Sequence, residues 1–558
     1  MPSEAAFAYH EPSIKTVLNY TGFLLVLNIA NTCLDKLLYC GLIGQLFIGV
    51  LWGTPGAKWL ERETETVIQQ IGYLGLILLI YEGGLSTSTK ALKANILLST
   101  AVALTGICVP MGLSFVLTEL ALATPLQAFS AGAALSATSL GTTFTILSIT
   151  QLTTTRLGTV TTSAAMLDDV VGLVMVQIIS NLGGNSSFSA VTVVRPVFVS
   201  LGFAFGLLLL CAFCLQPVLR ILISYRASLP DFAGSAQFAF LAHTCVLVGI
   251  VAGATYAGTS SLFAAYLAGV IVSWFDGLVA ESKLPAAEES SPAQAGSTAS
   301  QENVSRRGNS SGVDEVDMSD SRPTQQAEIS QHITGEVVYQ RYYKEPTNRI
   351  LLPLFFASIG FAIPITKMFS GQIVWRGIIY AILMAIGKMI TGLWLVRFSS
   401  NPIAGLVSIL RKPFTYAHSC AKRTDKASKK KSREKTQAPN TVTNQGVSQS
   451  SPQSDGSRAP SQLSMPPKPK SLYPSSILGL AMVARGEVGY LIASIAESQG
   501  IFSNGSSEGP SDIYLVVVWA ISLCTLIGPI LVGTLVRRVK KLQLSRDQGS
   551  DPLGVWGI

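Results

Sequence analysis

Long apolar segments alternate with short polar connections along most of the chain. A helix that crosses a bilayer needs about 20 mostly apolar residues, or fewer where the helix is broken. The segments that fit this pattern are roughly residues 17–34, 37–53, 69–86, 93–119, 124–149, 157–181, 192–222, 234–256, 259–276, 350–369, 373–397, 473–497 and 511–536. The sequence therefore predicts an all-α integral membrane protein with about 13 transmembrane helices.

Two long polar segments interrupt this pattern, residues 278–345 and residues 398–472. The first is rich in Ser, Ala, Gln and Glu, and the second carries thirteen Lys or Arg against three Asp or Glu. Both hold too few large apolar residues to build a core, so we predict two disordered cytoplasmic loops. They divide the transmembrane spans into residues 1–277, 346–397 and 473–536, and residues 537–558 form a cytoplasmic tail.

Charge supports the same class of protein. Only 13% of the residues are charged, against roughly 25% in an average soluble chain. The net charge of +8 does not indicate nucleic-acid binding, because the basic residues gather in a few connections and in the tail. Their distribution predicts a cytoplasmic C-terminus and an N-terminus outside. The basic insert and the outside sequons at Asn19, Asn185 and Asn504 fit a plasma membrane or endomembrane.

An inverted repeat is consistent with the order of the spans. The segments from 37–53 to 157–181 and from 259–276 to 511–536 form two sets of five that cross the membrane in opposite senses. Transporters built on such repeats place their site where broken helices meet. We expect the two breaks, crossing each other, in segments 124–149 and 473–497.

The sequence at the first expected break contains small and hydroxyl-bearing residues around a glycine. Thr138, Ser139 and Thr142 follow each other closely in mid-segment. Such residues weaken a helix and supply oxygens, so we expect them to line an ion site. A packed helix interface of small residues is the alternative.

The strongest candidate for chemistry is the pair of adjacent carboxylates Asp168 and Asp169, in the middle of an apolar segment. Acidic residues inside a membrane are costly and usually functional. Neighbours on a helix point about 100° apart, so the two carboxylates cannot serve one face equally. We expect Asp169 to face a water-filled cavity and bind a proton or a monovalent cation, while Asp168 meets a partner.

Lys388 is the predicted partner of Asp168. It lies too deep in segment 373–397 to reach the interface, and a buried ammonium needs a counter-charge. Arg485 and Glu487 flank a glycine at the second expected break, and we predict a structural ion pair between them. Competition between a proton and a monovalent cation for Asp169 would couple the proton flux to the cation flux. Proton release from Lys388 would make the transport cycle electrogenic.

With these residues the sequence resembles the monovalent cation:proton antiporter superfamily, the sodium/hydrogen exchangers. The paired aspartates and Lys388 resemble its electrogenic branch more closely. Residues 41–53 and 354–361 resemble two further spans of the family. The resemblance implies exchange of Na⁺, Li⁺ or K⁺ for H⁺ for pH and cation homeostasis, with no cofactor. It also implies a homodimer with a mobile core and elevator-like alternating access.

Three alternatives remain open. A cation channel would show a re-entrant filter loop or repeated pore helices, and the sequence shows neither. A cation-coupled symporter of an organic solute would need a larger site with aromatic or cationic contacts. A membrane sensor that transports nothing would act through its polar inserts, which contain no recognisable domain. An enzyme is not indicated, because no catalytic set can be assembled around the four histidines.

Overall fold

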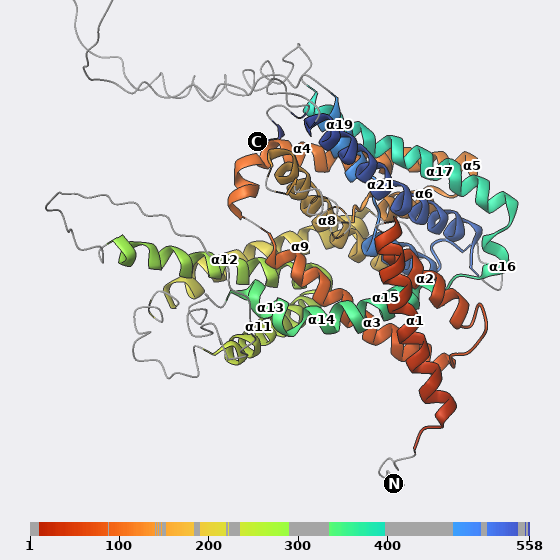
Figure 1. Ribbon diagram of the computed structural model, residues 1–558, viewed down its shortest axis with the longest axis horizontal. Coiled ribbons are helices and arrows are strands. Elements are labelled where there is room, and N and C mark those ends of the chain that lie inside the picture. Colours follow the sequence, from red (N-terminus) through yellow and green to blue (C-terminus); the bar gives the residue numbers. More distant parts are fainter. Residues whose placement is uncertain are drawn as a thin grey trace, which may run out of the picture. The chain divides into compact units, whose positions relative to one another are not determined.

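The computed structural model describes the greater part of the hydrophobic chain. The described residues are 11–38, 40–87, 89–139, 141, 143, 147, 152–153, 155–183, 190–218, 221, 235–288, 334–396, 472–503, 510–544, 553 and 556–557. In these ranges every regular element is a helix, as the sequence predicts (Figure 1).

The helices follow the predicted apolar segments closely. They are α1 (Ile14–Leu38), α2 (Gly41–Trp52), α3 (Arg62–Leu85), α4 (Thr89–Leu113), α5 (Leu117–Leu120), α6 (Pro125–Ser136), α8 (Arg156–Leu182), α9 (Ala190–Leu210), α11 (Ala236–Ala257), α12 (Ser261–Glu288), α13 (Gly335–Tyr342), α14 (Lys344–Pro346), α15 (Leu352–Gly360), α16 (Ile365–Met368), α17 (Gly371–Met389), α19 (Tyr473–Ala481), α20 (Glu487–Ser498) and α21 (Asp512–Leu544). Among the described residues, nine helices are long and apolar enough to cross a membrane. The count of thirteen stays a prediction, since the broken helices fall below that length.

Hydroxyl residues define where two of the central helices begin. Thr124 caps α6: its side chain accepts a hydrogen bond from the backbone of Gln127, and the Gln127 side chain accepts one from the backbone of Thr124. Thr155 accepts a hydrogen bond from Gly158 in the same way at the start of α8. These caps satisfy amide groups that have no partner inside the helix.

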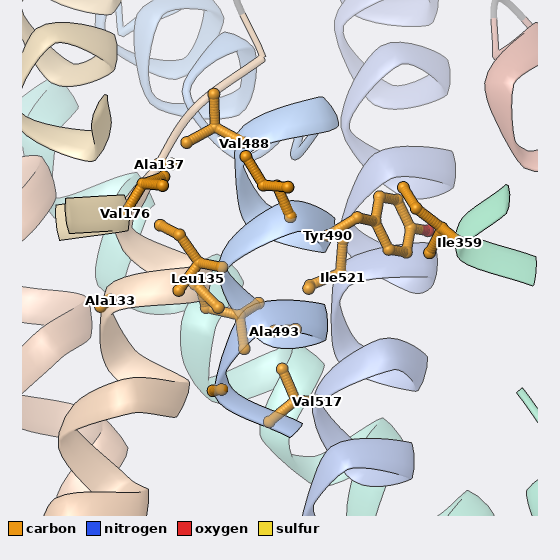
Figure 2. Close-up of a cluster of buried hydrophobic side chains, with 14 of the residues drawn as sticks. Ala133, Leu135, Ala137, Val176, Ile359, Val488, Tyr490, Ala493, Val517 and Ile521 are labelled. Atoms are coloured by element: carbon orange, nitrogen blue, oxygen red, sulfur yellow. The ribbon is translucent and has the colours of Figure 1, made fainter. Parts of the chain in front are cut away.

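The core lies where α6, α8, α15, α20 and α21 meet. Figure 2 shows buried side chains from all five helices interleaved there, including Leu135, Val176, Ile359, Tyr490 and Ile521. Glycines bring other helices closer still: a Cβ on Gly84 of α3 would lie 2.2 Å from a backbone oxygen of α12. Close packing of this kind holds α8 and the two broken helices in one body.

The structure differs from the expected disorder at both ends of the first polar insert. Helix α12 continues to Glu288, and α13 begins at Gly335, where the Gly335 amide donates to the Asp276 carboxylate at 2.6 Å. Val338 and Tyr339 of α13 are buried. The average composition of the insert did not predict these helical ends, because a few apolar residues are enough to form a helix where a neighbouring helix packs against them. Residues 289–333 and 397–471 lie outside the described residues.

Candidate functional site

Two broken helices cross at the centre of the protein. Helix α6 ends at Ser136 and the chain continues in an extended conformation through Ala137. The second break separates α19 from α20. The Ser139 amide donates to the Ala484 carbonyl at 3.0 Å, and the Thr143 hydroxyl donates to the Ala481 carbonyl at 3.1 Å. The two predicted breaks therefore exist, and they are bonded to each other.

Gly486 permits this close crossing. A Cβ at this position would lie 2.6 Å from the hydroxyl oxygen and 2.7 Å from the Cβ of Ser139. Real Cβ atoms do not approach other atoms so closely, so any other residue would push the two breaks apart.

Asp168 and Lys388 meet beside this crossing. The Lys388 ammonium nitrogen lies 2.6 Å from Asp168 Oδ2, and both side chains are fully buried. Thr138, on the first break, joins them: its hydroxyl donates to Asp168 Oδ2 and accepts from Lys388 at 2.8 Å. The structure thus brings together the pair expected from the sequence and bonds it to the first broken helix.

Asp169 faces a different environment from its neighbour. It is partly exposed and lines a cavity of about 440 Å³. Glu487, Tyr266 and Glu82 line the same cavity. Among the described residues, Asp169 Oδ1 and Asp168 Oδ1 have no hydrogen-bond partner. Each aspartate therefore has one carboxylate oxygen without a hydrogen-bond donor, and of the two residues only Asp169 borders the cavity.

The predicted ion pair between Arg485 and Glu487 is wrong. Within the described part of the chain no ion pair joins them. Arg485 is fully buried and donates to the carbonyls of Ser136 and Ala137, at 3.2 and 3.0 Å. Glu487 begins α20. The reason is the helix dipole: the cation lies at the carbonyl end of α6, and the carboxylate lies at the amide end of α20.

Two predicted site residues at the first break remain, Ser139 and Thr142. Ser139 is buried and forms a hydrogen bond with the Glu487 carboxylate, whereas Thr142 lies outside the described residues. Glu82 and Tyr266 were not among the site residues predicted from the sequence. A carboxylate near the end of the third apolar segment was a usable signal for Glu82. A tyrosine in an apolar helix gives no comparable signal.

These features define a class of protein. Crossed broken helices, a buried ion pair and a carboxylate in a cavity, within a bundle of membrane-length helices, are the parts of a multi-pass membrane transporter. A family model described as "Sodium/hydrogen exchanger, transmembrane" matches residues 23–287. The match covers just under half of the chain, and over these residues the chain is similar to the monovalent cation:proton antiporters, which are transporters and not enzymes.

Individual relatives agree with this family. The high-affinity Na⁺/H⁺ antiporter NhaS3 of Synechocystis sp. is 26% identical over 234 residues, which cover 42% of this chain and 49% of NhaS3. Cation/H⁺ antiporter 17 of Arabidopsis thaliana is 31% identical over 218 residues, 37% of this chain and 25% of the relative. The chain thus spans half or less of the length of these two relatives.

A solved structure shares the fold. The sodium proton antiporter MjNhaP1 from Methanocaldococcus jannaschii aligns with a TM-score of 0.52 at 13% identity, covering 94% of this chain and 99% of that protein. At this identity the match concerns the fold alone, and it agrees with the all-helical architecture described above.

Proposed function

We propose that this protein is a secondary antiporter that exchanges a monovalent cation for protons, and that Asp169 carries both. The observation that supports this most is the asymmetry of the two aspartates. Asp168 is held by Lys388 at 2.6 Å in a fully buried pair, while Asp169 lines the cavity. Asp168 is thus occupied by an ion pair, and Asp169 is the carboxylate that borders the cavity.

The chemistry follows from competition for one carboxylate. A proton on Asp169 removes the negative charge that attracts a cation, and a bound cation disfavours the proton. Glu82 and Glu487, which line the same cavity, add negative potential around it. Na⁺, Li⁺ and K⁺ all suit such an oxygen-lined site, so the ion is left to experiment.

Lys388 determines the charge balance in this proposal. Exchange of one proton for one cation on Asp169 moves no net charge. When Asp168 also engages the cation, Lys388 loses its counter-charge and gives up its proton, so two protons leave for one cation. The cycle is then electrogenic.

The proposal extends to the whole assembly. We propose a homodimer in a lipid bilayer, with the N-terminus outside and the C-terminus in the cytoplasm, working by alternating access for cation and pH homeostasis. The basic connections and tail support this orientation, and the resemblance to the exchangers supports the dimer.

The test is cation-driven proton movement in proteoliposomes with an imposed pH gradient. We expect Na⁺, Li⁺ or K⁺ to dissipate the gradient with wild-type protein and not with Asp169→Asn at equal reconstitution. Asp512→Asn is the matched control, because Asp512 is exposed at the start of α21. It should exchange like wild type.

Each outcome has a defined meaning. If Asp169→Asn exchanges as well as wild type, the transport class survives and the site is wrong. If no monovalent cation affects the wild type, antiport fails. A cation-coupled solute symporter then becomes the better hypothesis, because a cavity of about 440 Å³ is within the size range of small-molecule sites.

A further inference from the structure

After the last long helix, the chain packs against the helical bundle again. Helix α21 ends at Leu544, yet Leu553 and Trp556 are only 2% and 8% exposed. They belong to a buried apolar cluster that is separate from the core of Figure 2. Its other members come mainly from α4, α8, α19, α21 and the connection between the first break and α8, and include Leu147 and Leu152.

A charged contact fixes the place of the tryptophan. The guanidinium carbon of Arg156 lies 5.1 Å from the centre of the Trp556 ring. Arg156 is the first residue of α8, where the helix dipole is unfavourable to a cation. The electron-rich face of an indole ring compensates for this, because it attracts a guanidinium.

The same cluster is connected to the ion site through the first broken helix. Leu147 is fully buried in the cluster, four residues after Thr143 in the chain. Thr143 donates to the Ser139 carbonyl at 2.8 Å and to the Ala481 carbonyl at 3.1 Å. Thr138, which directly precedes Ser139, forms hydrogen bonds with both Asp168 and Lys388.

We propose that Trp556 and Arg156 are positioning residues for the ion site. Their contact holds Leu147 and Leu152 in the buried cluster beside α8, and thereby keeps Thr138 and Ser139 in place beside the aspartates. This inference rests on the proposed antiport. It assigns to the segment after α21 a role in cation affinity.

The first experiment measures exchange as a function of cation concentration in proteoliposomes. Trp556→Ala and Arg156→Gln should each raise the half-saturating cation concentration roughly threefold to tenfold, with little change in the maximal rate. The half-saturating cation concentration of the double variant should be no higher than that of the weaker single variant, because each substitution removes the same contact. Trp556→Phe and Arg156→Lys should retain most of the affinity. Trp375→Ala, at a 48% exposed site on α17, is the control.

The second experiment does not depend on transport. Hydrogen exchange of the purified full chain should be faster in residues 141–152 of Trp556→Ala than in wild type, with α17 unchanged. Unchanged exchange in residues 141–152 would overturn the proposal, even if the wild type transported nothing. So would an effect confined to the maximal rate or to thermal stability, or effects that multiply in the double variant. Wild-type protein without cation exchange would refute the antiport and not the positioning contact.

Discussion

The buried ion pair makes a quantitative prediction about stability. Lys388→Met preserves much of the side-chain volume but leaves the Asp168 carboxylate buried with only the Thr138 hydroxyl as a donor. Removing one partner of a buried pair costs about 3–5 kcal/mol, because the remaining charge is uncompensated. Replacing both partners by apolar residues is often close to neutral. The double variant Asp168→Leu, Lys388→Met should therefore be more stable than Lys388→Met alone.

Thermal unfolding of the purified protein in detergent at fixed pH measures this effect. Arg349→Met is the matched control, since Arg349 pairs with Glu345 at 3.3 Å with side chains 65% and 74% exposed. An exposed pair contributes about 0–1 kcal/mol. We expect the control near wild type, the double variant below it, and Lys388→Met lowest.

The order of the unfolding temperatures tests whether an uncompensated buried charge destabilises Lys388→Met. If the double variant unfolds at least as early as Lys388→Met, uncompensated charge is not the source of the loss. If Lys388→Met and Arg349→Met have equal effects, burial adds nothing to the pair, and Asp168 does not stabilise the folded protein through Lys388.

Three further predictions concern transport. Gly486→Ala should abolish exchange, because its Cβ would lie 2.6 Å from the Ser139 hydroxyl; Gly253→Ala, with open space around it, should behave like wild type in the same proteoliposome assay. Thr138→Val removes a hydroxyl bonded to the ion pair and should raise the half-saturating cation concentration about fivefold, from roughly 1 kcal/mol of lost hydrogen bonding; unchanged affinity would contradict its place in the site. Lys388→Ala should alter or abolish the dependence of exchange on membrane voltage, and currents identical to wild type would exclude a proton-releasing role for Lys388.

The sequence allowed the helices and one contact of the site to be predicted. Burial of apolar side chains and the cost of charge in lipid are local properties, so they could be read from residue patterns without neighbours. The contact between Lys388 and Asp168 could also be anticipated, because a fully buried ammonium has few alternatives to the nearest free carboxylate.

Other contacts depended on the tertiary structure. Arg485 and Glu487 are two residues apart, yet they interact with the ends of different half-helices and not with each other. The sequence spacing suggested a pair, but the crossing of the breaks placed helix dipoles of opposite sense beside them. No local pattern indicated that Trp556 would face Arg156.

The difference between the features that the sequence predicted and those that it did not has a single physical origin. Whether a segment becomes a membrane helix depends on the solvation of its own residues, and the sequence alone determines that. Which polar groups then share the interior depends on how close the backbones approach, as at Gly486 and Ser139. That approach results from the packing of segments far apart in the chain, and only the folded protein establishes it.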